Sequence, residues 1–389
     1  MFSLNTLLYM ATSIIGVVLV HIALDNISMF LKEGLLKDRF NFENESFEQC
    51  KDLQTNDYSV NIPMRYYYKG KFRKGWENIV NPFRGTWVVG TPGSGKTFSI
   101  IESFIRQHSE KGFALVLYDY KFPSLATKLY FHYPKNPSYL LIANDPEIES
   151  IIGALNALIL KRLVTRVNTG QGKNIPTSII VDELPTLYFH KIDRLIGTAR
   201  SSKVSVTLGF QELPQLEADY GKVGMQKIIT TVGNVVSGSA RSKETLEWLS
   251  SDIFGKVVQL KKGVTIDRDK TSINLNENMD SLVPASKISD MPTGWICGQT
   301  ARDFVKTKTG RGGSMNIQES EELKTSKFYC KTDFNMADIK KEEDGYVALP
   351  KFYTFKSRDE RERILYKNFV QVGEDVKSMI NTIQRYKVK

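Results

Sequence analysis

The sequence predicts an α/β fold in which a mostly parallel β-sheet is covered by helices. Three observations predict this class. After Asn81, short apolar runs of strand length alternate with longer runs of helical periodicity. A glycine-rich segment separates the first such strand from the first such helix. Another apolar run ends abruptly in two carboxylates. Strands that alternate with helices favour a parallel sheet with both faces covered.

The expected elements follow one another in a regular order. The strands are GTWVVG, FALVLYDY, YLLIAND, TSIIVDE, VSVTLGFQ and NVVSGSA. The helices begin at Thr97, Glu147, Lys191 and Met225. The first of them is expected to end at Gly112, a typical helix stop. The charged segment after Lys356 is expected to form an amphipathic C-terminal helix or pair of helices with a solvated face.

The composition narrows the class of protein. A chain of 389 residues has room for one large domain or two, and 41% hydrophobic residues argue against whole-chain disorder. The net charge of +10 favours a polyanionic partner, either nucleic acid or an anionic membrane face. Three scattered cysteines predict no disulfide framework and indicate a reducing compartment. Four scattered histidines lack metal-ligand spacing, so no zinc site is expected.

The N-terminal segment is expected to anchor the chain in a membrane. Leu7 to Leu24 carries no Asp, Glu, Lys or Arg, and this length fits one helical span of a bilayer. A cleaved signal peptide and a buried core helix are the alternatives. The basic residues Lys32, Lys37 and Arg39 follow this segment. Their position predicts that the remaining chain lies in the cytoplasm.

A basic and aromatic strip, RYYYKGKFRKGW, occupies Arg65 to Trp76. The pattern predicts a β-hairpin with Gly70 near its turn and aromatic side chains packed on one face. Such a strip also suits binding to nucleic-acid phosphates and bases, or to anionic lipid head groups. The sequence leaves both partners open.

The glycine-rich segment fits the pattern G-x-x-x-x-G-K-[ST] between a strand and a helix, which is the context of a phosphate-binding loop. Its eight residues are Gly90, Thr91, Pro92, Gly93, Ser94, Gly95, Lys96 and Thr97. Glycines let successive backbone N–H groups curl around a phosphate, and the helix directs its positive end toward the anion. Lys96 is expected to reach the outer phosphates of ATP, and the Thr97 hydroxyl to ligate Mg²⁺.

The strand TSIIVDE supplies the carboxylates that a magnesium–nucleotide site needs. Asp182 is the expected Walker B residue, which holds Mg²⁺ through water, and Glu183 is suited to orient and deprotonate the attacking water. Gln211, at the end of a later strand, is either a sensor of the γ-phosphate or a strand-end cap. Arg200 and Arg241 are either arginines that act on a neighbouring subunit's nucleotide or plain surface residues.

Longer stretches resemble a family. They include NPFRGTWVVGTPGSGKT, YDYKF, VDELPTLYF, IGTARSSKVSVTLGFQELPQLEADYG and MDSLVPASKIS. From about Asp57 to Ala301 the chain resembles the type IV coupling proteins, in particular the mobilisation-protein C (TraG-like) branch. The resemblance implies a RecA-like ATPase of the FtsK/HerA kind, with Lys96, Thr97, Asp182 and Glu183 in its nucleotide site. It implies that Gln211 is the sensor and that Arg200 acts in trans.

The resemblance also implies partners and a place in the cell. Such proteins are bacterial inner-membrane hexamers that link a relaxase-bound DNA strand, the relaxosome, to a type IV secretion channel. Hydrolysis of ATP then drives single-stranded DNA or protein across the envelope. On this basis the chain divides into an anchor at residues 1–25, a juxtamembrane linker with the hairpin at 26–80, a RecA-like ATPase domain at 81–305 and a C-terminal extension at 306–389.

The sequence departs from the family in two respects. One membrane helix is expected where members usually carry two. The large all-α insertion between the strand after the loop helix and the Walker B strand also has no counterpart, which leaves the cargo open. A nucleotide-gated docking protein that recruits protein effectors to a secretion channel is therefore the alternative function, and a small-molecule kinase is a third.

Overall fold

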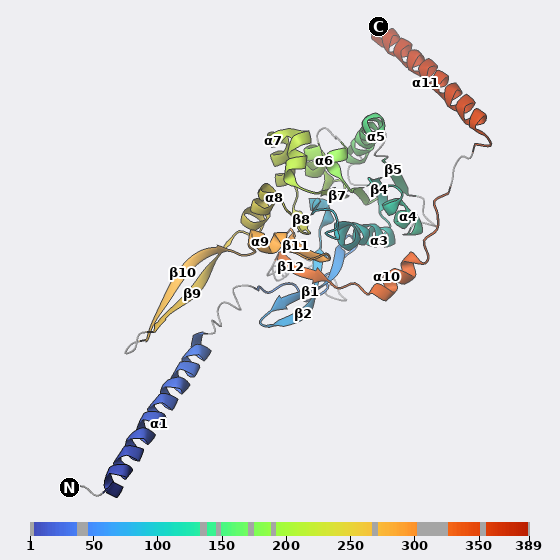
Figure 1. The fold of residues 1–389 in the computed structure, drawn as a ribbon. Coiled ribbons are helices and arrows are strands. Elements are labelled where there is room, and N and C mark those ends of the chain that lie inside the picture. The colour runs from blue at the N-terminus through green and yellow to red at the C-terminus, as the bar shows by residue number, and fades with distance from the viewer. Residues whose placement is uncertain are drawn as a thin grey trace, which may run out of the picture. The chain divides into compact units, whose positions relative to one another are not determined.

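A ten-stranded β-sheet, in the order β2-β1-β12-β11-β8-β3-β7-β6-β4-β5, forms the centre of the chain (Figure 1). The computed structural model describes residues 4–36, 46–132, 138–144, 149–169, 175–187, 192–266, 271–301, 326–350 and 355–387. The chain divides into two compact units, Met1–Tyr346 and Val347–Lys389. The sheet lies in the first unit.

One side of the sheet is parallel throughout. Its strands are β8 (Asn234–Ser237), β3 (Thr86–Val89), β7 (Val204–Phe210), β6 (Thr177–Val181), β4 (Ala114–Asp119) and β5 (Tyr139–Ala143). These strands are mostly apolar, and β3, β6, β7 and β8 are fully buried. All six were predicted from the sequence, each within a few residues of the observed bounds.

Helices cover both faces of this parallel part. They are η2 (Thr97–Ile101, a π-helical turn), α3 (Glu102–Glu110), α4 (Ser124–His132), α5 (Glu149–Thr169), α6 (Ile192–Ala199) and α7 (Leu213–Thr231). Two separate apolar clusters result. Trp87 and Val89 contribute to one cluster, and Val88, between them on the same strand, contributes to the other. Successive side chains of a strand point to opposite faces, so the prediction of a mostly parallel sheet covered by helices is confirmed.

The other side of the sheet is antiparallel. It consists of β11 (Trp295–Gln299), β12 (Lys327–Thr332), β1 (Val60–Tyr68) and β2 (Lys71–Ile79). The β1–β2 hairpin confirms the hairpin predicted around Gly70. Lys69 and Gly70 both have positive φ angles, of 51° and 76°. A two-residue turn with positive φ at both positions matches the right-handed twist of the paired strands.

The antiparallel strands change the expected division of the chain. The hairpin was expected in a linker and β12 in a C-terminal extension, but both are strands of the same sheet. The first compact unit therefore continues to Tyr346. Part of the expected extension, residues 306–325, lies outside the described residues, as do Lys37 and Arg39.

Several smaller elements complete the first unit. They are η1 (Pro82–Arg84), η3 (Leu184–Thr186), α8 (Lys243–Glu247), η4 (Trp248–Ile253), α9 (Ala285–Ser289), α10 (Met336–Glu343) and the two-stranded sheet of β9 (Lys256–Ile266) and β10 (Thr271–Ser281). Between β4 and β6 the described residues form only α4, β5 and α5, and no separate helical domain is found among them. This arrangement agrees with the direct connection that the sequence indicated.

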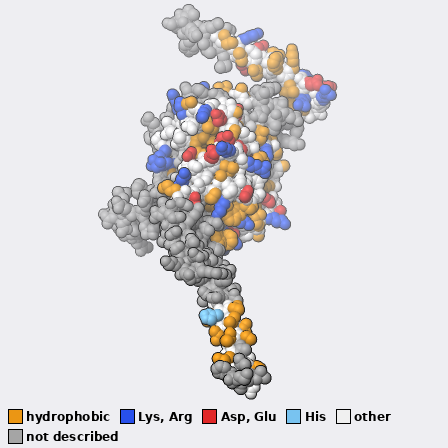
Figure 2. Space-filling model, turned by 60° about the vertical axis from the view of Figure 1, so that its left-hand side comes forward, with side chains coloured by type: hydrophobic (Ala, Val, Ile, Leu, Met, Phe, Trp, Pro, Cys, Tyr) orange, Lys and Arg blue, Asp and Glu red, His pale blue; other side chains and the backbone are white. Residues whose placement is uncertain are grey.

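Both ends of the chain carry a long helix. The N-terminal helix α1 spans Leu4–Leu36, and hydrophobic side chains cover much of its described surface (Figure 2). In the part of the chain that the structure covers, no helix meets the length and hydropathy that a membrane span requires. Helix α11 (Arg358–Lys387) lies in the second unit and confirms the predicted C-terminal helix.

Strand β1 is fixed to the helix that follows the glycine-rich segment. The side chain of Gln107 on α3 accepts a hydrogen bond from Asn61 N at 2.9 Å and donates one to Asn61 O at 2.8 Å. The Asn61 side chain in turn donates to Asn78 Oδ1 on β2 at 2.7 Å. Because an unpaired buried polar group is costly, this network holds the hairpin and α3 in one arrangement.

A buried carboxyl group on β2 gives the fold a testable pH dependence. Glu77 is 5% exposed, and burial raises its pKa from 4.5 to about 8, against a hydrogen bond from Thr300 that lowers it. Between pH 4.5 and about pH 8, Glu77 is protonated in the folded state and ionised in the unfolded state, so the folded state holds one proton more. The free energy of unfolding should therefore fall as pH rises through this window.

We expect Glu77→Gln, which is neutral at every pH, to match the wild type near pH 5. At pH 8 the variant should be more stable by roughly 4 kcal/mol, since the pKa rises from 4.5 to about 8 and one pKa unit corresponds to about 1.4 kcal/mol. Urea denaturation of both proteins at the two pH values measures the difference. Equal pH dependence of the two proteins would show that Glu77 is not the group responsible.

Candidate functional site

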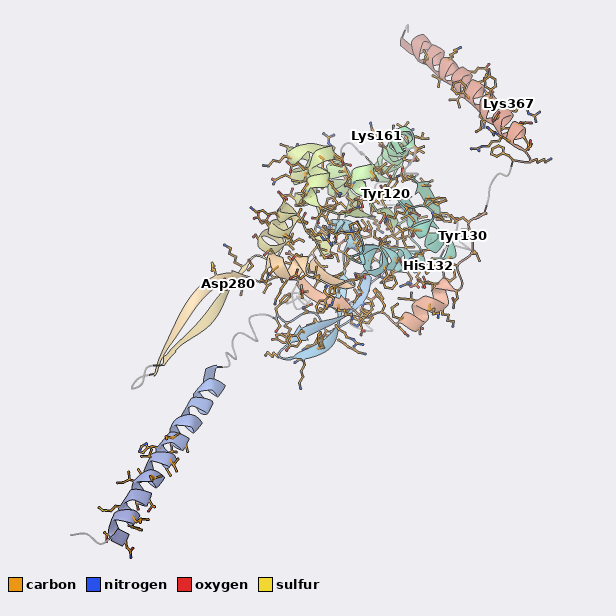
Figure 3. The ribbon with its side chains drawn as sticks, in the orientation of Figure 1. Tyr120, Tyr130, His132, Lys161, Asp280 and Lys367 are labelled. Atoms are coloured by element: carbon orange, nitrogen blue, oxygen red, sulfur yellow. The ribbon has the colours of Figure 1, made fainter. Side chains whose placement is uncertain are left out.

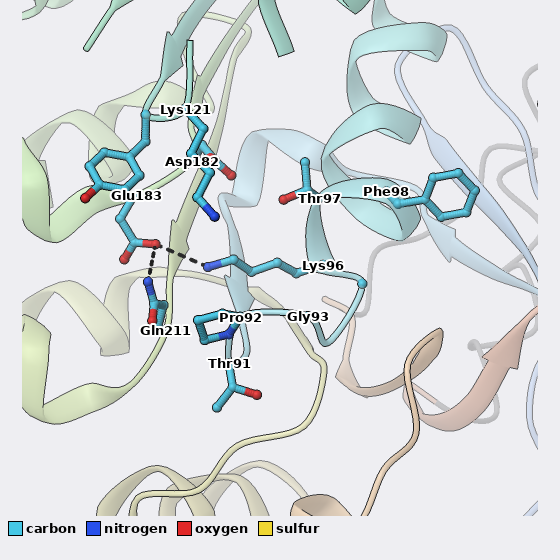
Figure 4. A pocket seen from close by; sticks show the side chains of 12 residues that line it. Thr91, Pro92, Gly93, Lys96, Thr97, Phe98, Lys121, Asp182, Glu183 and Gln211 are labelled. Atoms are coloured by element: carbon cyan, nitrogen blue, oxygen red, sulfur yellow. Dashed lines mark hydrogen bonds and ion pairs between the residues drawn. The ribbon is translucent and has the colours of Figure 1, made fainter. Parts of the chain in front are cut away.

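The glycine-rich segment forms a loop at the carboxyl end of β3, between that strand and η2 (Figure 4). The backbone of Gly90, Gly93 and Gly95 has positive φ angles of 147°, 82° and 89°, a region that favours glycine. A Cβ atom at Gly90 would lie 2.7 Å from Ser94 Oγ. A hydrogen bond of 3.1 Å from Ser94 N to Thr91 O closes the loop. These contacts explain why this sequence, and not a bulkier one, can make the turn.

The loop leads directly into a helical end. Lys96 immediately precedes the π-helical turn η2, which begins at Thr97 and continues into α3. Ser99 N donates to Gly95 O at 2.8 Å, so the first turn is formed immediately after the last glycine. The free N–H groups and the dipole at this end favour an anion.

Lys96 lies between the loop and the ends of β6 and β7. Its Nζ is 3.3 Å from Glu183 Oε2 and 3.4 Å from Phe210 O. Gln211 Nε2 donates to the same Glu183 oxygen at 3.2 Å, so the carboxylate accepts from both side chains (Figure 4). The side chains of Lys96 and Glu183 are only 11% and 7% exposed. Burying a charge is costly, and the direct contact between these two opposite charges offsets part of that cost.

Asp182 follows the last residue of β6 and is 8% exposed. Burial raises its pKa to about 6, with the charge of Lys96 acting in the opposite direction. Its Oδ1 atom is buried and makes no hydrogen bond within the described residues. A buried carboxylate oxygen without a partner suits a hydrated cation, and the Thr97 hydroxyl lines the same cavity.

These side chains enclose a cavity of about 230 Å³. Its lining consists of Thr91, Pro92, Gly93, Gly95, Lys96, Thr97, Phe98, Tyr120, Lys121, Asp182, Glu183 and Gln211. Backbone amides and two lysines lie beside two carboxylates and the Thr97 hydroxyl, and this set of groups fits the phosphates of a nucleotide with Mg²⁺. A second cavity of about 340 Å³ adjoins it, since Tyr120, Glu183 and Gln211 line both.

Most of the predicted site residues meet in the first cavity, and two arginines do not. Gly90 and Ser94 shape the loop without lining the cavity. Arg200 is exposed in the turn after α6, and Arg241 is exposed after β8, with its backbone N–H bonded to Glu212 Oε1 at 2.7 Å. Neither arginine lines a cavity of this site within the described chain. Their proposed action on a neighbouring subunit stays a prediction.

Three lining residues were not predicted as site residues. Tyr120 follows β4 directly (Figure 3), Lys121 comes next, and Phe98 follows Thr97. The segment YDYKF entered the sequence analysis only as part of a resemblance. The position of Tyr120 and Lys121 was nevertheless a usable signal, because β4 pairs in parallel with β6 and both strands end at the same edge of the sheet. Ligands of open α/β sheets bind at that edge.

Lys121 gives a first test of this cavity. We expect Lys121→Ala to weaken Mg²⁺–ATP binding about tenfold, since a charge-assisted hydrogen bond contributes about 1.5–3 kcal/mol. Titration with a fluorescent ATP analogue measures the affinity. Lys340→Ala, which removes an exposed lysine on α10, is the matched control and should bind like the wild type. An unchanged affinity of the Lys121 variant would exclude this lysine from phosphate binding.

Asp182 gives a second test, based on pH. Above about pH 6 the carboxylate is ionised, so at pH 7.5 Asp182→Asn should weaken the Mg²⁺-dependent part of nucleotide binding about tenfold. Below pH 6 the wild-type carboxyl becomes neutral, and the two proteins should converge. Bound Mg²⁺ opposes protonation of Asp182, so the affinities of the two proteins are expected to converge nearer pH 5. ATP itself titrates in this range, and taking the ratio of the two affinities cancels that effect. A ratio that does not change with pH would contradict the assignment of Asp182 to the Mg²⁺ site.

Comparison with known proteins adds an independent observation. Residues 176–293 match a family model described as "TraM recognition site of TraD and TraG". No match was found among curated proteins. Among solved structures the chain is similar to the "Bacterial conjugative coupling protein TrwBdeltaN70", with 13% identity, a TM-score of 0.47, and coverage of 57% of this chain and 82% of that chain.

Two further structures illustrate the range of similarity. The plasmid coupling protein TrwB in complex with ADP and Mg²⁺ is 16% identical, with a TM-score of 0.36 and coverage of 49% of this chain and 45% of that chain. The genome packaging NTPase B204 from Sulfolobus turreted icosahedral virus 2, in complex with AMPPCP, is 14% identical, with a TM-score of 0.36 and coverage of 59% and 96%.

The family match begins just before β6 and includes Asp182, Glu183 and Gln211. It therefore covers the strand ends that form one wall of the cavity, and it lies within the stretch for which the sequence showed a resemblance. The match supports the resemblance to the type IV coupling proteins predicted from the sequence: over residues 176–293 the chain is TraG/TraD-like.

Proposed function

We propose that this chain is a membrane-anchored, ATP-driven motor of conjugative DNA transfer, which couples a relaxase-bound DNA strand to a type IV secretion channel. The observation that supports the motor best is the contact of Glu183 with both Lys96 and Gln211, beside the unpartnered oxygen of Asp182. Three strands contribute these residues to one cavity that also contains the glycine-rich loop. A site of this composition is suited to hydrolysis and not only to binding.

Each residue has a defined task in this proposal. The loop amides, Lys96 and Lys121 bind the phosphates of ATP, while Thr97 and Asp182 hold Mg²⁺. Mg²⁺, when bound, neutralises phosphate charge. Phe98 and Tyr120 line the same cavity.

Glu183 is the proposed general base. In the structure its Oε2 atom accepts from Lys96 and from Gln211. When Lys96 turns to a phosphate, one of these partners leaves, and the carboxylate becomes free to accept a proton from water. Gln211 keeps the carboxylate oriented. Nucleotide binding would therefore activate Glu183 as a base. Without nucleotide, the carboxylate stays paired with Lys96.

The partners are proposed from the resemblance and the composition. They are single-stranded DNA, the relaxase or relaxosome, components of the secretion channel, and further copies of the chain in a homo-hexamer. The protein is placed at the bacterial inner membrane as a single-pass protein with its ATPase domain in the cytoplasm. The uncharged apolar segment from Leu7 to Leu24 supports this location, and the family match to a region described as a TraM recognition site supports a relaxosome partner.

A nucleotide-gated docking protein is the second candidate. Two observations favour it: the matched region is described as a recognition site, and the described residues hold no helical insertion between β4 and β6. Such a protein would use ATP as a switch and respond to its protein partner. The two functions share the nucleotide site and differ in what stimulates hydrolysis.

The decisive experiment is ATP hydrolysis by the purified chain with and without single-stranded DNA. We expect DNA to stimulate the wild type, with strong salt dependence because phosphate contacts release counterions. Glu183→Gln should retain nucleotide binding and lose hydrolysis at least ~100-fold, the usual contribution of a general base. Lys96→Ala should lose binding as well, and Lys340→Ala should behave like the wild type.

Two results would redirect the proposal. Stimulation by a protein partner and none by DNA would favour the docking protein. Undiminished hydrolysis by the Glu183 and Lys96 variants would remove the basis for any ATPase at this cavity.

A further inference from the structure

The turn of the β1–β2 hairpin carries a basic surface to which the proposed motor assigns no task. We call residues 67–74 the hairpin tip. This segment contains four cations and three aromatic rings, and it contains no Asp or Glu. The residues are Lys69, Lys71, Arg73 and Lys74, and Tyr67, Tyr68 and Phe72. The tip therefore combines an uncompensated positive charge with apolar ring surface.

The lysines of the tip are exposed and unpaired with any acidic side chain of the described residues. Lys69, Lys71 and Lys74 form no ion pair with any carboxylate of the described chain. Arg65, lower on β1, differs from them, since its Nε is 2.8 Å from Asp333 Oδ2. The positive field of the hairpin is thus concentrated at its turn.

Each aromatic ring of the tip contacts a neighbour within the tip, but Phe72 stays largely exposed. Lys69 Nζ lies 5.2 Å and Arg73 Cζ 5.5 Å from the centre of the Tyr68 ring. Tyr67 and Phe72 form a T-shaped pair with ring centres 5.4 Å apart. Base stacking needs an open ring face, and Tyr68 has cations against it. The Phe72 side chain is nevertheless 64% exposed.

An exposed phenylalanine among lysines has a specific physical preference. Lysine and arginine are attracted to anionic lipid head groups, and aromatic rings favour the boundary between head groups and acyl chains. Lysines on an edge strand such as β2 also prevent pairing with other strands. Protection of the sheet edge needs no exposed phenylalanine. The exposed Phe72 therefore favours contact with a membrane surface over a role in edge protection alone.

The tip is presented by a fixed support. The network of Asn61, Asn78 and Gln107 joins the base of the hairpin to α3. The turn itself has the backbone of a tight two-residue loop. A surface that is held in place loses little entropy on binding.

We propose that the hairpin tip binds anionic lipid head groups of the membrane, with Phe72 inserted at the head-group boundary. The lysines supply attraction, at about a fivefold gain in affinity for each charge near the surface. The inference rests on the membrane location proposed above and specifies a second contact, separate from α1. Nucleic acid is the rival partner for the same charges.

Lysine footprinting of the full-length wild-type chain tests this inference. The protein is reconstituted with vesicles of neutral phosphatidylcholine, or of phosphatidylcholine with about one third phosphatidylglycerol, and flotation is recorded for each sample. A membrane-impermeant acetylating reagent then modifies accessible lysines, which mass spectrometry quantifies. The exposed Lys340 and Lys341 on α10 normalise the signal within the same molecules. A third sample contains single-stranded DNA and neutral vesicles.

We expect acetylation of Lys69, Lys71 and Lys74 to fall at least fivefold, relative to Lys340 and Lys341, with anionic vesicles only. Protection by DNA and not by anionic lipid would overturn the inference, as would equal labelling in all samples. Flotation separates the two proposals. Flotation with both vesicle types but without protection of the tip lysines would contradict lipid binding by the hairpin tip. It would leave the proposed membrane anchor intact. Flotation and lysine protection with anionic vesicles alone would support lipid binding by the hairpin tip and contradict the proposed membrane anchor.

A variant separates insertion from simple attraction. Phe72→Ser should keep the protection at low salt and lose it at ~0.5 M salt, where charges are screened. The wild type should retain part of its protection. Val223→Ser, which changes a 70% exposed residue on α7, is the matched control. Identical salt dependence of the wild type and the Phe72 variant would show that the ring does not insert.

Discussion

The ion pair between Lys96 and Glu183 is the constraint on which the site depends. Both side chains are nearly buried, so neither charge is tolerated without the other. The pair joins the loop after β3 to the end of β6, and these two strands are not neighbours: β7 lies between them. The contact therefore exists only if three strands are in the correct order and register. At Gly209 on β7 a Cβ atom would lie 2.0 Å from Asp182 O, so a residue without a side chain permits this close approach.

Distant parts of the chain brace the helix that follows the loop. Arg106 on α3 forms a bidentate contact with Glu342 on α10, at 3.0 and 3.3 Å, and His132 on α4 lies 2.9 Å from the same carboxylate. On the other side, Gln107 binds the backbone of β1. The first strand of the sheet and one of the last helices of the first unit thus both hold α3. Its position, and with it the start of the loop helix, depends on contacts across the whole unit.

The parallel part of the sheet and the residues of the candidate site at its carboxyl edge were accessible from the sequence because their signals are local. The loop residues Gly90 to Thr97 form a spacing pattern, and each buried strand is a short apolar run. The antiparallel strands were less accessible. β12 is separated from β11 along the chain and is inserted between β11 and β1 in the sheet, and no local pattern specifies that pairing. The position of Lys121 after a predicted strand indicated the binding edge, but its closeness to Asp182 depends on the pairing of β4 with β6, which the sequence did not specify.

By itself the sequence determined the elements of the parallel sheet, the glycine-rich loop, the acidic strand end and the hairpin around Gly70, because backbone preference and side-chain periodicity act over a few residues. The tertiary structure decided the order of the strands, the shared contact of Lys96 and Gln211 with Glu183, the inclusion of Tyr120 and Lys121, and the position of Arg200 and Arg241 outside the cavity. These features depend on how strands and helices far apart in the chain pack together, and burial sets the charge state of Asp182 and Glu77 only after that packing is complete.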